Sequence, residues 1–257
     1  MNVACRMLAA QEDGLLSIRT LLVITVTLSE KFHRDGYLLL QDYFDADLMQ
    51  RLDERIRAHF GRDPSFLHSD EFLEKAKTDV IPWFPQSDGP SEFDLLDDHE
   101  ELRQLTGTLL GEGWQRMTCM VMFSKQGTAG QAWHQDCAPQ RPARYNLNRL
   151  VYTRDIDDET GGQTVVVPGS HRRGLLPAGS PWGDFDDQQI LRPRRGTLML
   201  LHGHAWHRVL PIHGRYRYST NYRAVPAGTA PDVTDVCVYR NMRYRFSTET
   251  IIEERTA

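Results

Sequence analysis

The sequence predicts a mainly β protein with flanking helices, namely a double-sheet jelly roll with N-terminal helices packed against one sheet. Short apolar or alternating segments, separated by Gly- and Pro-containing turns, follow one another from residue 114 to residue 225. The helical patterns all lie before residue 111. Many short strands after N-terminal helices are typical of this architecture. The chain has 257 residues, 40% of them hydrophobic, which is enough for one core of good size.

We divide the chain into an N-terminal extension, residues 1–27, and a single domain, residues 28–257. The apolar run 15–28 contains Arg19 and follows two acidic residues. It is too short to span a bilayer, and a signal peptide would begin with basic residues instead. We therefore expect a cytoplasmic protein without a membrane partner. The role of the extension is left open.

Charge and cysteine content restrict the partners further. The net charge is −5, from 30 Lys and Arg against 35 Asp and Glu. Nucleic-acid-binding proteins normally show a basic excess, so nucleic acid is not the expected partner. The four cysteines form no C-x-x-C pattern, which predicts reduced thiols rather than a disulfide framework. A small-molecule substrate is therefore expected, and the oligomeric state is left open.

Two helices are predicted in the first 60 residues. The segment Thr27–Glu30 has the form of a capping box, and the helix that it starts is short and ends after Asp35. Asp45 or Asp47 then caps a second helix that continues to His59. Its apolar residues recur at helical spacing and predict a stripe that faces the core.

A short strand, a long loop and a third helix complete the N-terminal half. Tyr37–Gln41 is apolar and predicts the strand. Residues 61–92 are loop-like, with mixed charge and several prolines. Because loops on a rigid scaffold usually carry specificity, we expect this one beside the functional site. The third helix is predicted over Asp94–Leu110 and ends at Gly111, a normal glycine after a helix.

The remaining chain predicts strands. Residues 116–125 alternate, which puts Lys125 on the same face as Val121 and Phe123, and Ser124 on the other face. Further strands are predicted around His134 and Asp136, and over Leu147–Ile156, Thr164–Val167, Thr197–Leu201 and Tyr216–Val225.

One of these strands carries candidate metal ligands. A strand places residues two apart on the same face, so His134 and Asp136 reach one point while Gln135 turns away. With a later histidine they form a set of two histidines and one carboxylate, which binds Fe(II) and leaves other coordination positions open. The same ligand types also suit Zn²⁺. The candidates for the third ligand are His202, His204 and His207.

A later strand, Tyr216–Val225, has a polar face. Arg217, Ser219 and Asn221 share this face, and Arg215 precedes them on it. A polar face inside a small barrel is unusual unless something polar binds there. An arginine suits a carboxylate because its planar guanidinium matches the two oxygens. The face therefore predicts a carboxylate-binding position at Arg217 or Arg215.

Several further segments stand in a definite order along the chain. They are Phe32–Leu38 (F-H-R-D-G-Y-L), Ser124-Lys125, Trp133–Asp136 (W-H-Q-D), Gly161–His171 (G-G-Q-T-V-V-V-P-G-S-H), Leu200–His202 with His207, and Arg217. Each segment alone is modest support, but the ordered set resembles one family closely. It is similar to the phytanoyl-CoA dioxygenase (PhyH-like) family of Fe(II)/2-oxoglutarate-dependent oxygenases.

The resemblance implies a double-stranded β-helix, a cupin-like jelly roll, with iron and 2-oxoglutarate bound at its open end. Family members commonly have one histidine at the end of a buried strand and the ligand five residues later. The resemblance therefore implies His207 as the third ligand and His202 as a supporting neighbour. It also implies Arg217 as the residue that binds the far carboxylate of 2-oxoglutarate. Ser219, on the face of Arg217, is a further candidate for cosubstrate binding, and Lys125 is either another such contact or a solvated strand end. Fe(II), 2-oxoglutarate and O₂ are the cofactors expected.

We interpret the protein as an Fe(II)/2-oxoglutarate-dependent dioxygenase that hydroxylates or otherwise oxidises a small polar metabolite, with 2-oxoglutarate converted to succinate and CO₂. Relatives that halogenate lack the carboxylate ligand, so Asp136 favours hydroxylation, desaturation or ring closure. Two alternatives stay open. They are a zinc-dependent hydrolase or isomerase on the same ligands, and a non-catalytic metal- or metabolite-binding barrel. Neither needs Arg217.

The substrate is expected to be polar or anionic, but the sequence does not name it. The loop 61–92 combines mixed charge with an aromatic pair, Trp83-Phe84, which favours a polar substrate stacked on Trp83. Eight arginines are either scattered surface charge or a ring around the mouth of the site that attracts an anion. These are Arg141, Arg144, Arg172, Arg173, Arg192, Arg194, Arg195 and Arg208.

Overall fold

A computed structural model of the chain describes residues 18–61, 80–137, 139–140, 142–229, 235–238, 242–246 and 251–256. Its helices are α2 (Ile18–Asp35), α3 (Ala46–Phe60), α5 (Asp94–Asp97) and α6 (Glu100–Leu110), with two short 3-10 helices, η1 (Pro85–Asp88) and η2 (Ser170–Arg172). Within the residues described, none of the helices combines the length and the apolar character that crossing a membrane requires.

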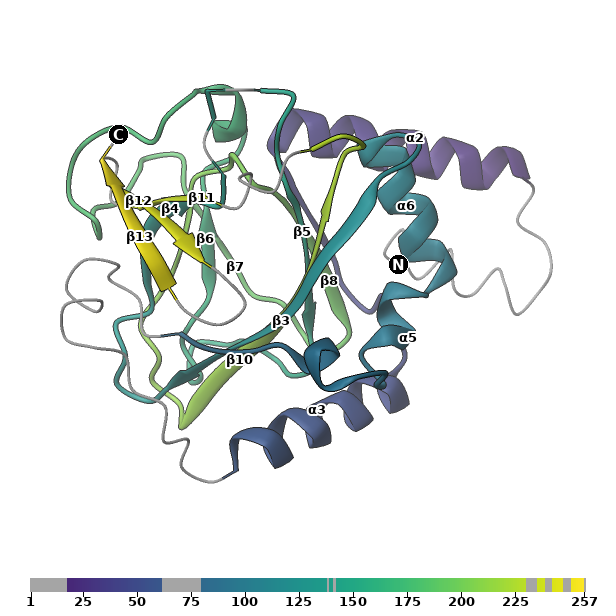
Figure 1. Ribbon diagram of the computed structural model, residues 1–257, viewed down its shortest axis with the longest axis horizontal. Helices are drawn as coiled ribbons and strands as arrows, with labels where there is room; N and C mark the ends of the chain where they lie inside the picture. Colours follow the sequence, from purple (N-terminus) through teal and green to yellow (C-terminus); the bar gives the residue numbers. More distant parts are fainter. Residues whose placement is uncertain are drawn as a thin grey trace.

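Two antiparallel sheets form the body of the molecule (Figure 1). The six-stranded sheet has the order β1-β8-β5-β10-β3-β2. Its strands are β1 (Tyr37–Leu40), β2 (Ile81–Trp83), β3 (Gln115–Lys125), β5 (Leu147–Tyr152), β8 (Thr197–His202) and β10 (Tyr216–Val225). The seven-stranded sheet has the order β13-β12-β11-β4-β9-β6-β7. Its strands are β4 (Gln131–Gln135), β6 (Thr164–Val166), β7 (Gln189–Leu191), β9 (His207–Val209), β11 (Asp235–Val238), β12 (Met242–Phe246) and β13 (Ile251–Thr256).

The helices cover the outer face of the six-stranded sheet. In Figure 1, α3, α5 and α6 lie on the side of this sheet that faces away from β4, β6 and β11. The largest apolar cluster joins helix residues such as Phe32, Leu52 and Leu102 to Val121 of β3 and Tyr222 of β10, each at most 1% exposed. The apolar stripes of the helices therefore pack against alternate positions of the strands. The predicted jelly roll with helices on one sheet is confirmed.

The first two helices agree with the sequence to different degrees. Helix α2 begins at Ile18, so Thr27–Glu30 lies inside it and the predicted capping box is wrong. The prediction fails because the helical run of apolar residues continues on the N-terminal side of Thr27. For α3 the prediction is confirmed, since the Asp45 carboxylate caps the helix and accepts a hydrogen bond from the Leu48 N–H at 2.8 Å.

The third predicted helix is divided into α5 and α6 by a tertiary contact. The guanidinium of Arg116 donates to the Asp97 carbonyl at 2.8 Å and to the Asp98 carboxylate at 2.6 Å. In a continuous helix, the Asp97 carbonyl would accept from the N–H four residues later. A bond from β3 takes the place of this helical bond, and α6 starts only at Glu100.

The loop and the C-terminal region also differ from the sequence prediction. Residues 80–92 of the predicted loop form β2 and η1, whereas residues 62–79 lie outside the described part of the chain. The sequence predicts no strand after Val225, but β11 pairs with β4, and β12 and β13 extend the same sheet. Cys119 and Cys137 are buried, and neither forms a disulfide with another described residue.

The space between the two sheets has an apolar half and a polar half. The apolar half is formed by β5 and β8 with β6 and β7, through Leu150, Tyr152, Val166, Leu191, Met199 and Leu201. The polar half lies along β10, whose buried residues include Arg217, Ser219, Asn221 and Arg223. Ser219 pairs with Met122, which packs against the apolar half, so the face of β10 that carries Ser219 points inward. The other three residues alternate in step with Ser219 and share this face. The polar face that the sequence predicts is therefore inside the jelly roll.

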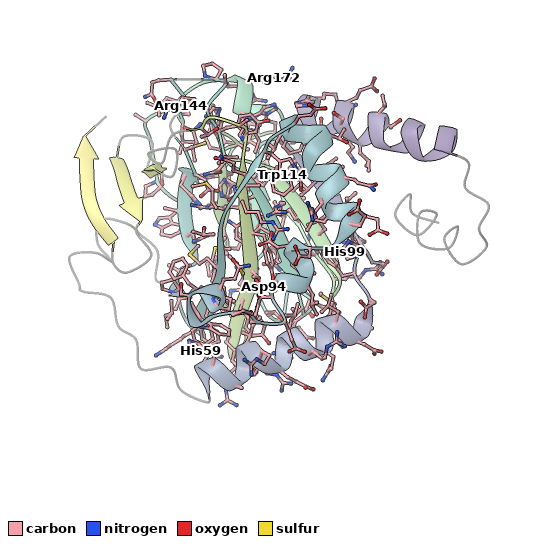
Figure 2. The ribbon with its side chains drawn as sticks, turned by 45° about the vertical axis from the view of Figure 1, so that its right-hand side comes forward. His59, Asp94, His99, Trp114, Arg144 and Arg172 are labelled. Atoms are coloured by element: carbon pink, nitrogen blue, oxygen red, sulfur yellow. The ribbon has the colours of Figure 1, made fainter. Side chains whose placement is uncertain are left out.

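The P-G-S-H segment closes the end of α2. The Gly169 N–H and the side chains of His171 and Arg172 donate to the carbonyls of the last helical turn, at 2.7, 3.1 and 2.9 Å. Figure 2 shows Arg172 beside this end of the helix. The last carbonyls of a helix have no partner within it. The segment is therefore a helix cap as well as a turn.

His171 belongs to a cluster of histidines at the same end. The ring of His202 stacks on Tyr145 at 4.0 Å between centroids, has Phe32 at 6.0 Å, and lies 4.9 Å from the ring of His171 and 5.0 Å from that of His204. Burial, followed by the charge that the neighbouring histidines would carry, lowers the pKa of His202 well below 6.5. Burial also lowers the pKa of His171 below 6.5. Both rings are therefore neutral at neutral pH.

We expect the free energy of unfolding to fall as the pH decreases below about 6.5. In the unfolded chain both histidines have their ordinary pKa of 6.5, so the unfolded state binds protons that the folded state does not. The contribution of the two neutral rings to the free energy of unfolding is complete above pH 6.5. It is lost as the pH falls toward the lowered pKa values of the folded state. Denaturant titrations at a series of pH values measure it. A His202→Phe variant, whose ring also stacks on Tyr145, should show a shallower pH dependence, and an equally steep one would contradict the assignment.

Candidate metal centre

The three candidate ligands lie on two neighbouring strands. Strands β4 and β9 pair antiparallel, with His134 directly opposite His207, and Asp136 follows the end of β4. Alternation directs His134 and Asp136 inward. Gln135 points to the other side, where its amide donates to the His204 carbonyl at 2.8 Å. The sequence prediction for this strand is therefore correct.

The geometry fits a divalent metal ion. The ligand atoms of the three residues lie within 4.8 Å of one another, and the Nε2 atoms of His207 and His134 are 3.4 and 3.9 Å from the Asp136 carboxylate. The Nδ1 atom of His134 is 2.7 Å from the Ala132 carbonyl, and the Nδ1 atom of His207 is 3.0 Å from the Ala205 carbonyl. Because a carbonyl only accepts, Nδ1 carries the proton and Nε2 presents its lone pair to the centre.

His134 is held in the neutral form that a metal requires. Its burial, followed by the charge that His207 would carry, lowers its pKa to about 4. The other candidates for the third ligand lie elsewhere. His202 belongs to the histidine cluster, and the Nε2 of His204 is 3.1 Å from the Arg144 carbonyl. The structure therefore brings His207, as the family resemblance implies, to His134 and Asp136.

Two residues that the sequence analysis missed hold the carboxylate of Asp136. Arg223 Nη2 donates to one oxygen at 3.1 Å, and Asn148 Nδ2 donates to the other at 2.7 Å. Burial alone would raise the pKa of Asp136. The charge of Arg223, followed by the charge that the two histidines would carry and by the Asn148 hydrogen bond, holds this pKa below its usual range. The carboxylate is therefore ionised and oriented. Arg223 shares the alternation of Arg217, and this signal was available in the sequence.

Arg217 is a buried guanidinium without an acidic partner. It is 4% exposed, and it donates from Nε to the Gly162 carbonyl at 3.2 Å and from Nη1 to Ser219 Oγ at 3.0 Å. Burial lowers its pKa, although Tyr152 opposes this effect. Within the described chain no carboxylate pairs with it, and a buried charge is costly without a counter-charge. Arg215 is exposed instead. Arg217, rather than Arg215, is therefore placed to receive an anion.

The second glycine of the Gly-Gly turn makes room for Arg217. Gly162 has a φ of +70°, and a Cβ at this position would lie 2.8 Å from Arg217 Cγ. Both the backbone conformation and the contact require glycine. The turn therefore supports the inner face of β10, which explains why a G-G pair precedes β6.

The prediction for Lys125 is wrong. Lys125 pairs with Tyr216, whereas Arg217 pairs with Ser124. Residues that pair across antiparallel strands share a face, and Phe123 and Tyr216 on the face of Lys125 pack into the helix-side core. Lys125 thus lies on the opposite face from Arg217. The alternation of β3 separates Lys125 from Ser124, and the register with β10 decides which of the two shares a face with Arg217.

Of the two alternatives for the eight arginines, the described part of the chain gives no support to a ring around the mouth of the site. Four of them pair with acidic residues, as Arg173–Asp187 (2.5 Å), Arg192–Asp158 (2.9 Å), Arg194–Asp42 (2.5 Å) and Arg208–Asp184 (2.6 Å). Arg195 donates to Gln50 and Arg172 caps α2, while Arg141 lies outside the described residues. These arginines tie loops to neighbouring elements, so they give no support to an anionic substrate.

Trp83 lies away from the metal centre. On β2 it is opposite Val121, and its ring stacks on His59 with the centroids 3.9 Å apart. Figure 2 places His59 at the opposite end of the molecule from Arg144, whose carbonyl contacts His204. The predicted stacking of a substrate on Trp83 is therefore wrong, because the residue belongs to the contact between α3 and the six-stranded sheet.

Ser170, which is fully buried, supports the strand of the third ligand. Its Oγ accepts the Trp206 N–H at 2.8 Å, and the Val167 N–H donates to the Trp206 carbonyl at 3.0 Å. Both backbone groups of the residue before His207 are therefore held by the turn that caps α2.

We expect Ser170→Ala to weaken the binding of a divalent metal about tenfold, because the groups around metal ligands typically contribute ten- to a hundredfold in affinity. Calorimetric titration of the metal-free protein with Co(II) measures the effect. His171→Gln, in the same turn but without a contact to Trp206, is the control and should bind Co(II) as the wild type does. Unchanged affinity in Ser170→Ala would mean that the serine stabilises only the turn.

The jelly roll and this donor set fit the class of iron- and 2-oxoglutarate-dependent enzymes. The chain matches the family model of phytanoyl-CoA dioxygenase (PhyH) over residues 32–217, and it belongs to this family. No curated protein matches the chain.

Solved structures share the fold. The non-heme, alpha ketoglutarate dependent epimerase SnoN from nogalamycin biosynthesis is 21% identical, with a TM-score of 0.64 over 80% of this chain and 84% of SnoN. HygX from Streptomyces hygroscopicus, solved with nickel and 2-oxoglutarate, is 13% identical, with a TM-score of 0.60 over 83% of this chain and 88% of HygX. At these identities the likeness shows the fold, a double-stranded β-helix.

Proposed function

We propose that the protein is an Fe(II)/2-oxoglutarate-dependent dioxygenase that hydroxylates or otherwise oxidises a small polar metabolite. One observation carries this proposal. The buried donor set of His134, Asp136 and His207 opens to the same interior as Arg217, a buried guanidinium that lacks an acidic partner in the described chain. A metal with open positions and an anchor for a carboxylate are the two elements that 2-oxoglutarate requires.

Each residue has a distinct role in this proposal. His134 and His207 hold the iron through Nε2, and Asp136 holds it through one carboxylate oxygen. When bound, iron together with 2-oxoglutarate supplies the activation of O₂. Arg217 binds the far carboxylate of 2-oxoglutarate through charge-assisted hydrogen bonds, with Ser219 beside it. Arg217 and Ser219 would thereby hold one end of the cosubstrate on the inner face of β10.

The comparisons support a small-molecule substrate. One SnoN structure contains Fe³⁺, alpha ketoglutarate and nogalamycin RO, and one HygX structure contains nickel, 2-oxoglutarate and hygromycin B. SnoN is an epimerase, which adds epimerisation to hydroxylation, desaturation and ring closure as outcomes of such a site. The polar half of the interior favours a polar metabolite over an acyl-CoA ester.

Two other uses of the donor set are a zinc-dependent hydrolase or isomerase and a non-catalytic metal- or metabolite-binding barrel. Neither requires a buried guanidinium on the inner face of β10, ten residues after the third ligand. Arg217 therefore favours the oxygenase.

Anaerobic addition of Fe(II) and 2-oxoglutarate to the purified protein tests the proposal. We expect a visible charge-transfer band that requires both components and, in air, succinate formation that polar metabolites stimulate and acyl-CoA esters do not. Absence of the band would contradict the oxygenase, and efficient turnover of a long-chain acyl-CoA would contradict the polar substrate.

A further inference from the structure

The polar half of the interior contains a chain of hydrogen bonds whose direction Asp136 determines. An ionised carboxylate only accepts, so the amide of Asn148 must turn its Nδ2 toward Asp136, at 2.7 Å. Asn148 Oδ1 is then an acceptor, and it receives Arg223 Nε at 3.1 Å and Asn221 Nδ2 at 2.8 Å. The amide of Asn221 is thereby oriented as well, with its own Oδ1 turned away from Asn148.

This oxygen of Asn221 lacks a partner. Asn221 is 3% exposed, and its Oδ1 is buried without a hydrogen-bond donor among the residues described. The residues directly opposite on the neighbouring strands are Met120 and Leu150, and neither side chain has a donor to offer. Buried acceptors in native proteins are nearly always paired, because an unpaired one destabilises the fold. The oxygen therefore points to a donor from outside the protein.

Asn221 lies in the proposed active site. Two hydrogen bonds, through Asn148, connect it to the ligand Asp136. It shares the inward face of β10 with Arg217 and Ser219, four and two residues earlier. The missing donor cannot be 2-oxoglutarate, since at neutral pH both carboxylates and the keto group of this molecule only accept hydrogen bonds.

We propose that Asn221 recognises the substrate that the enzyme oxidises, and that this substrate presents a hydroxyl or an amine to the Asn221 Oδ1. This inference rests on the proposed function and narrows its substrate class. The substrate is a polar molecule that carries a hydrogen-bond donor near the metal. A site built to accept a hydrogen bond discriminates against an analogue that lacks the donor, because the acceptor of the site is then left unpaired.

Two probes with the same ring but different donors test the proposal. They are trans-1,2-cyclohexanediol and its dimethyl ether, added under nitrogen to the protein loaded with Fe(II) and 2-oxoglutarate. The shift of the charge-transfer band reports binding. We expect the wild type to bind the diol about tenfold more tightly than the ether, and Asn221→Leu, which keeps the size but not the acceptor, to bind both within about twofold.

The neighbouring residue provides a matched control. Thr220 also has a buried side-chain oxygen without a partner, but it pairs with Val121 on the face that packs against the helices. Thr220→Val should therefore keep the preference for the diol. Asn221→Ala replaces Asn221→Leu if the latter does not fold, and thermal unfolding of each variant shows whether it does.

Three results would overturn the role of Asn221. In the first, the wild type binds the diol no better than the ether, or binds neither. In the second, the preference for the diol survives the loss of the Asn221 amide. In the third, the preference disappears in Thr220→Val. The charge-transfer band before the addition of a probe separates this failure from a failure of the proposed function. A wild type without the band is not an Fe(II)/2-oxoglutarate enzyme, whereas an intact band without a probe preference rejects only the assignment of Asn221.

Discussion

Replacing His207 with alanine is expected to abolish iron binding and the conversion of 2-oxoglutarate to succinate while the fold stays intact. The same result is expected for His134→Ala and Asp136→Ala. The three side chains supply one donor atom each to a single point, and a metal that keeps open positions for its other ligands depends on all three. Iron content, succinate formation and thermal unfolding of the purified variants measure the outcome.

His204→Ala is the matched control for this prediction. His204 is buried, lies three residues before His207, and directs its Nε2 to the Arg144 carbonyl rather than to Asp136. The variant should retain its iron. Normal iron content and turnover in His207→Ala would contradict the ligand assignment, and loss of iron in His204→Ala alone would transfer the role to that histidine.

The second large effect is expected at Arg217. Arg217→Ala should raise the concentration of 2-oxoglutarate needed for half-maximal turnover by roughly 30- to 1,000-fold, which corresponds to about 2–4 kcal/mol. The substrate requirement should change far less. The reason is that the buried guanidinium, which would bind the far carboxylate through charge-assisted hydrogen bonds, is lost. Initial rates at varied 2-oxoglutarate and titration of the charge-transfer band measure the effect.

Arg215→Ala is the comparison for this variant. Arg215 is exposed and lies two residues earlier, at the entry to the same strand. Its loss should leave the 2-oxoglutarate requirement near that of the wild type. If Arg215→Ala shows the large increase and Arg217→Ala does not, the residue that binds the cosubstrate has been misassigned.

The correct predictions rest on rules that act within one strand. Alternation alone places His134 and Asp136 on one face of β4, and it places Arg217, Ser219 and Asn221 on one face of β10. The same rule separates Lys125 from Ser124, but only the pairing of β3 with β10 shows that Ser124, and not Lys125, lies on the face of Arg217. Alternation was therefore reliable in both strands, whereas the capping box at Thr27–Glu30, which is also a local rule, was wrong.

Three of the incorrect predictions depend on partners that lie far away in the sequence. Arg194 is paired with Asp42, six strands earlier in the sequence, and no spacing rule connects the two. The mixed charge and the aromatic pair of the loop predicted that Trp83 contacts the substrate, but its position on β2 places it beside His59 of α3. In the same way, helix α5 ends because Arg116 of β3 takes the Asp97 carbonyl.

The sequence by itself determined the first two metal ligands and the polar face, because each depends on the period of a single strand. The choice of His207 came from the family pattern, and the structure agrees with it. Only the tertiary structure decided what holds Asp136, since Asn148 and Arg223 reach it from the six-stranded sheet, 12 and 87 residues away. These contacts exist because two sheets close over one polar interior, and buried polar groups must find partners across that space rather than along the chain.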